Sequence, residues 1–150
     1  MTSHRGGTSH GRAAGQTLVE FTLVTLLTVI LLLSIVEISR MVLIYTTVAN
    51  AARAGARYAI VHGATRTGSG VDGPSGPGGN PPQVLTVIRN FASAGLLTTG
   101  NLIISVSYPG ASNDPGQPVS VSVIYPYDPL TTYFPLRVRL GSQSQGVIAF

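Results

Sequence analysis

The sequence predicts an α+β protein: a long N-terminal helix, apolar in its first half and amphipathic in its second, packed on a small antiparallel sheet of three to four strands. Segment 21–36 contains no charged residue, and no proline occurs over 17–62. Several later segments alternate between apolar and polar residues. The first two features are typical of one continuous helix, and the third is typical of strands that bury one face.

Composition favours a lipid environment for part of the chain. Charged residues make up 9% of the 150 residues, and the mean hydropathy is +0.35, whereas soluble domains carry about 25% charged residues. A chain of this length forms one domain of ordinary size, so a lipid phase explains the apolar excess better than a very large core does. The absence of cysteine excludes a disulfide framework and thiolate chemistry.

The segment 21–36 is the candidate membrane span. As a helix it is about 24 Å long, slightly short of a bilayer core of about 30 Å. It can extend upstream through 16–19 if Glu20 is tolerated, and downstream through Ile38 and 41–44, past Glu37 and Arg40. Glu37 and Arg40 lie three residues apart in this extension, and we predict that they form a charge pair. A cleaved secretory signal is the main alternative, but its apolar region is about 7–15 residues long and ends at an Ala-x-Ala-like site. No such site follows closely here.

The residues before the span, 1–15, form a basic leader that is small and polar and has no apolar periodicity. No acid opposes the charges of Arg5 and Arg12, so the positive-inside rule keeps this end in the cytoplasm and the C-terminal domain on the export side. We expect the leader to be disordered and to stay out of the membrane.

The long helix is predicted over 16–63, and its second half carries a row of small residues. Ala52, Gly55, Ala56 and Ala59 are spaced three and four residues apart, which lets another backbone approach closely. Either this row packs on the protein's own sheet, with the neighbouring arginines in solvent, or part of the surface meets an adjacent subunit.

The rest of the chain divides into a loop and a small domain. Glycine and proline are too dense over 64–83 for a helix or a strand. The domain, 84–150, begins with a short amphipathic helix that ends at Gly95. Its strands are predicted at 104–108, 119–125 and 136–140, with a fourth candidate at 146–150.

Glu20 directly precedes the apolar run 21–36. An ionisable residue inside a membrane is costly and by default marks a functional site, whereas a glutamate at the headgroup level is simply solvated. The residue alone leaves both interpretations open. The segment Gly15-Gln16-Thr17-Leu18-Val19-Glu20-Phe21 follows a basic leader and opens a long apolar helix, and in this it resembles the processing site of type IV prepilins.

This resemblance implies that a prepilin peptidase cuts between Gly15 and Gln16. The new amino group would lie on Gln16, and its electrostatic partner would be Glu20, on an adjacent subunit of a filament. Pairing a buried carboxylate with a buried ammonium relieves the desolvation cost of both. The resemblance therefore gives a physical reason for Glu20 to lie in the apolar helix.

A wider stretch, from Gly15 to Ala59, resembles the TadE-like family of minor pilins and pseudopilins of the tight-adherence, Flp-type pilus system. The similarity is most specific over 50–59, Asn-Ala-Ala-Arg-Ala-Gly-Ala-Arg-Tyr-Ala. It implies a pilin-like fold in the bacterial inner membrane or in a pilus. It also implies the bilayer, a prepilin peptidase, a pilus assembly platform, and major or other minor pilins as partners. The implied function is structural, in the assembly of a pilus or related secretion filament.

No residue pattern predicts catalysis, a cofactor, a metal site or nucleic-acid binding. His4 and His10 lie in the leader, which leaves His62 without a nearby acid–nucleophile pair. The string 68–73 matches G-x-G-x-x-G, but no strand precedes it and Pro74 follows, so it lacks the context of a dinucleotide site. The nine basic residues, all arginine, form no cluster dense enough for nucleic acid.

One other class of function stays open, an unprocessed and permanently anchored protein of the cell envelope whose small domain binds an external ligand. Glu20 would then be incidental, and its replacement by glutamine would leave function intact. A neighbouring gene for a secretion ATPase would favour the pilus assignment.

Overall fold

A computed structural model of the chain describes residues 10–70, 73–95, 97–130 and 137–150. The chain divides into two units, Met1–Ser39 and Arg40–Phe150, and helix α1 (His10–Val61) contributes to both. The helix begins inside the leader, which was expected to be disordered. Arginine and alanine at positions 12–14 are good helix formers, and no proline interrupts them.

The first unit presents an apolar helix surface whose side chains are exposed. Several of its hydroxyl groups donate to backbone carbonyls one turn earlier, among them Thr22 to Leu18 at 2.7 Å and Ser34 to Ile30 at 2.8 Å. These polar groups therefore need no partner outside the helix, as is required in lipid. In the described part of the chain, α1 from Gly15 onward is the helix that is long and apolar enough to cross a membrane.

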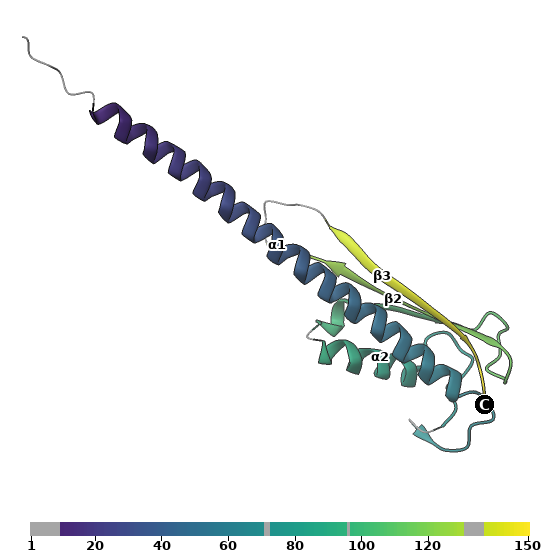
Figure 1. Ribbon diagram of the computed structural model, residues 1–150. Coiled ribbons are helices and arrows are strands. Elements are labelled where there is room, and N and C mark those ends of the chain that lie inside the picture. The colour runs from purple at the N-terminus through teal and green to yellow at the C-terminus, as the bar shows by residue number, and fades with distance from the viewer. Residues whose placement is uncertain (1–9, 71–72, 96, 131–136) are drawn as a thin grey trace, which may run out of the picture. The chain divides into compact units, whose positions relative to one another are not determined.

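Within its described residues, the second unit combines the second half of α1 with helices α2 and η2 and an antiparallel sheet (Figure 1). The sheet is antiparallel with strand order β1-β2-β3. This arrangement confirms the predicted α+β fold class. The elements are α2 (Pro82–Ala94), the 3-10 helix η2 (Thr99–Asn101), β1 (Ile103–Ser107), β2 (Pro118–Tyr127) and β3 (Val138–Val147).

The last two predicted strands, 136–140 and 146–150, are not separate elements. A single strand, β3, takes up parts of both and the residues between them, with Gly141 opposite Ile124 and Gly146 opposite Val119. The segment between them, Gly-Ser-Gln-Ser-Gln, has no apolar alternation, so its pattern did not indicate a strand. Residue 136 lies outside the described part of the chain.

Strand β2 passes through Pro126, although this strand was predicted to end at Tyr125. Strand β1 pairs with β2 only as far as Ile124, and beyond that point Pro126 pairs with Arg139 of β3 alone. A proline is tolerated at an open side of a sheet because no neighbouring strand needs the N–H that it lacks.

One core joins α1, α2 and a face of the sheet. Gly55 of α1 lies where the three meet: an added Cβ would lie 2.5 Å from Cγ1 of Ile88 on α2 and 3.4 Å from Cγ1 of Val121 on β2. The contact is thus too close for a larger side chain. Fully buried members of the core include Val48, Ala51, Ala52, Ala59, Val84, Ile88, Ala92, Val121 and Val123.

Candidate functional site

The row of small residues lies inside the second unit, against the protein's own core. The opposite side of the same stretch of α1 is exposed and polar, and there Arg53 Nη1 donates to Asn50 Oδ1 at 3.2 Å. The row itself therefore presents no open surface to a neighbouring subunit. Its buried members are Ala52, Gly55, Ala56 and Ala59.

The residues predicted for processing lie on the exposed first half of α1. Gly15, Gln16 and Glu20 are all exposed. Among the described residues, nothing lies within 4 Å of a Cβ added to Gly15. Contacts with the described residues therefore do not require glycine at this position.

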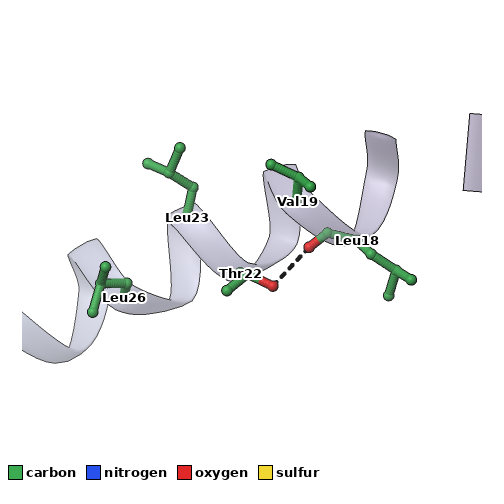
Figure 2. A pocket seen from close by; sticks show the side chains of 5 residues that line it. All are labelled: Leu18, Val19, Thr22, Leu23 and Leu26. Atoms are coloured by element: carbon green, nitrogen blue, oxygen red, sulfur yellow. Dashed lines mark hydrogen bonds between the residues drawn. The ribbon is translucent and has the colours of Figure 1, made fainter. Parts of the chain in front are cut away.

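The surface around Glu20 is apolar. Five side chains form a shallow hollow on the outside of the helix: Leu18, Val19, Thr22, Leu23 and Leu26 (Figure 2). The one hydroxyl among them, on Thr22, is already bonded to the Leu18 carbonyl. A carboxylate on such a surface is stable in a membrane only at the headgroup level or beside a cationic partner.

Arg40, the first residue of the second unit, is held by the end of β2. Its Nη1 donates to the backbone carbonyl of Asp128 at 3.0 Å. Its guanidinium carbon lies 5.1 Å from the ring centroid of Tyr127, which is within the range of a cation–π interaction. The pairing of Arg40 with Glu37 stays a prediction.

A group of buried polar residues, which no sequence pattern indicated, lies where α1 ends. Ser75 is 0% exposed, and both its Oγ and its N–H donate to the carbonyl of His62, at 2.8 and 2.7 Å. The Tyr108 hydroxyl donates to Ser75 Oγ at 3.1 Å, and Asn113 Nδ2 donates to the Ser75 carbonyl. These bonds connect the end of α1 to the loop after it, to the end of β1 and to the loop before β2.

His62 is bonded within this structural group. Its Nδ1 lies 2.8 Å from the carbonyl of Tyr58, and its ring stacks on the Tyr58 ring with centroids 3.8 Å apart. A carbonyl only accepts, so the proton lies on Nδ1. Among the residues that the structure describes, no group of three or more His, Cys, Asp or Glu side chains is placed to hold a metal ion.

Comparison with protein families assigns the first part of the chain. Residues 15–57 match the family model described as TadE-like protein. Over these residues the chain is similar to the TadE-like family. The match confirms the family resemblance seen in the sequence. It begins at Gly15, after which cleavage is expected, and it includes Glu20, Arg40 and most of the row of small residues.

The TadE-like assignment associates the protein with a Tad-type pilus and with a family that is structural rather than known for enzymatic activity. It agrees with the membrane-length helix from Gly15. Residues 58–150, which include the whole sheet, lie outside the match. Comparisons with curated proteins and with solved structures returned no match.

Proposed function

We propose that this TadE-like protein is a minor pilin or pseudopilin that takes part in assembling a tight-adherence-type pilus or related secretion filament. Helix α1 anchors it in the bacterial inner membrane, with the N-terminus in the cytoplasm and the second unit on the export side. The observation that carries the proposal is the TadE-like match over 15–57. It falls on a helix whose exposed apolar surface is interrupted by Glu20.

Cleavage between Gly15 and Gln16 by a prepilin peptidase is the first step of this proposal. It removes Arg5 and Arg12, the charges that favour a cytoplasmic N-terminus. It also creates an ammonium group on Gln16, one helical turn before Glu20. In a filament, the carboxylate of Glu20 forms an ion pair with the ammonium of an adjacent subunit. The two charges then compensate each other in the apolar helix layer.

The partners in this proposal divide between the two units. The peptidase, the assembly platform and the helices of major or other minor pilins contact the first unit. The second unit lies mostly beyond the TadE-like match. It therefore sets the contacts that distinguish this subunit from other pilins.

The test is the N-terminal residue of the protein isolated from membranes of cells with and without the prepilin peptidase. A mature chain that begins at Gln16 only in the presence of the peptidase supports the proposal. An intact leader under both conditions overturns it and leaves a permanently anchored binding protein as the function.

The variant Gly15→Leu sharpens this test. The described residues leave space for a side chain at Gly15, so a failure of cleavage would reflect recognition by the peptidase and not a misfolded helix. Gly11→Leu is the matched control because it makes the same change one helical turn earlier. We expect Gly15→Leu to keep its leader and Gly11→Leu to lose it.

A further inference from the structure

The exposed side of α1 stays apolar beyond Arg40. Val42, Leu43 and Tyr45 are exposed, Tyr45 by 49%, and the exposed side becomes polar from Thr46 onward, with Asn50, Arg53 and Arg57. Tyrosine is enriched at the level of lipid headgroups, and exposed aliphatic surface costs about 25 cal/mol per Å² in water. The boundary with water along α1 therefore lies near Tyr45, after the start of the second unit.

The end of β2 and the start of β3 lie at the level of this boundary. Arg40 is bonded to the carbonyl of Asp128, which fixes the end of β2 beside the first turn of the second unit. Two residues further on, Leu130 is 64% exposed. Arg137 and Arg139, at the start of β3, are exposed as well.

The charges at this end of the second unit suit an anionic surface. Across the described residues of 37–45 and 127–139 there are three arginines, at 40, 137 and 139, and two carboxylates, Glu37 and Asp128. Arginine forms bidentate hydrogen bonds with phosphate. A basic residue close to an anionic leaflet contributes about 1 kcal/mol of attraction.

We propose that this end of the second unit, which we call the basal surface, is seated in the headgroup layer of the membrane that α1 crosses. Leu130 reaches the acyl boundary, and the two exposed arginines contact the phosphates of anionic lipids. The occupant is lipid because the exposed apolar side chains of Val42 and Leu43 match an acyl boundary, and the exposed arginines 137 and 139 match the phosphates of an anionic leaflet. The basal surface consists of Val42, Leu43, Tyr45, Leu130, Arg137 and Arg139.

This inference rests on α1 crossing a membrane, as in the proposed function, and adds a lipid contact that orients the second unit. The chain contains no tryptophan, so a single introduced tryptophan reports only its own surroundings. The full-length variants Leu130→Trp, Val147→Trp and Leu27→Trp are reconstituted in phosphatidylglycerol-containing vesicles whose acyl chains carry bromine, a fluorescence quencher.

The three positions form a matched set. Leu27 lies in the apolar span and reports whether α1 enters the bilayer. Val147 is 58% exposed, similar to Leu130, but it lies at the other end of β3, about 26 Å from Arg139. We expect strong quenching at positions 27 and 130 and none at 147. We also expect quenching of Leu130→Trp to fall at least about twofold when Arg137 and Arg139 are both replaced by glutamine.

The outcomes separate the inference from the proposed function. Quenching at 27 but not at 130 shows that the basal surface does not contact lipid, while α1 still enters the bilayer. No quenching at 27 means that α1 does not cross the bilayer, and the proposed function then fails as well. Equal quenching of Leu130→Trp in neutral and in anionic vesicles overturns the contact of the arginines with lipid phosphates.

Discussion

The hydroxyl of Tyr108 lies 3.1 Å from Oγ of Ser75 in the interior of the second unit. The Ser75 hydroxyl donates a hydrogen bond to the carbonyl of His62, so Tyr108 is the donor in the bond between Tyr108 and Ser75. Burial raises the pKa of Tyr108 above its ordinary value of 10.0. The bond therefore links the stability of the fold to the protonation of one phenol.

We expect the second unit to lose stability above about pH 10 through Tyr108. Because the pKa of this group is raised in the folded protein, the unfolded chain releases the proton first. The contribution to stability is complete below 10.0 and disappears as the pH rises through the folded pKa. Thermal unfolding of the full chain in detergent, measured between about pH 8 and 11, should show this loss. The fall of the unfolding temperature with rising pH should be shallower in Tyr108→Phe. An equally steep fall would show that Tyr108 is not the group responsible.

Removal of the Ser75 hydroxyl is expected to lower the free energy of unfolding by about 1–3 kcal/mol, since it leaves the buried Tyr108 hydroxyl without its acceptor. The double variant with Ser75→Ala and Tyr108→Phe should lose less than the sum of the two single changes because it removes both partners. Ser69→Ala, at an exposed position in the same loop, is the control. Strict additivity in denaturant unfolding would show that the two side chains do not act as a pair.

Local periodicity was enough to predict most of the fold. The charge-free run predicted the first half of α1, and the alternation around Val121 predicted β2. Ser75 was not predictable, since it stands between Pro74 and Gly76 in a segment whose composition indicates only a loop. Its side-chain partner Tyr108 lies 33 residues away and Asn113 lies 38 residues away, and no local pattern shows which polar residue of a loop turns inward.

The candidate site, too, could be predicted from the sequence only in part. The spacing of Gly15 and Glu20 is local, so it was visible in the sequence and falls inside the TadE-like match. The contacts of Arg40 were not visible because the Asp128 carbonyl is 88 residues away. Only the folding of the second unit brings that carbonyl and the Tyr127 ring to Arg40.

Gly63 should not tolerate a side chain. A Cβ at this position would overlap the backbone oxygen of Phe150 and Cγ2 of Ile148 and would lie 2.8 Å from the backbone oxygen of Asn113. Backbone atoms cannot move alone, so we expect Gly63→Ala to lower the free energy of unfolding by about 2–3 kcal/mol. Gly78→Ala, where nothing described lies within 4 Å, should stay within about 0.5 kcal/mol of the parent. Similar denaturant midpoints for the two variants would refute this packing.

The last prediction concerns Glu20, whose replacement by glutamine removes the charge and keeps the size of the side chain. We expect Glu20→Gln to be cleaved normally, because Gly15 and Gln16 are unchanged. Its incorporation into pili should fall at least about tenfold, since the ammonium of an adjacent subunit then lacks a counter-charge in an apolar layer. Tenfold corresponds to about 1.4 kcal/mol, which is below the 3–5 kcal/mol typical of breaking a buried ion pair. The measurement is the ratio of this protein in sheared pili to that in membranes.

Glu20→Asp is the matched control because it keeps the charge on a side chain one methylene shorter. If the charge matters, this variant should retain more incorporation than Glu20→Gln, although less than the parent. If the glutamine variant enters pili as well as the parent, Glu20 lies solvated at the headgroup level and has no electrostatic role in assembly. Normal cleavage together with lost incorporation separates the two steps, because the peptidase then recognises the segment around Gly15 while the filament requires the carboxylate of Glu20.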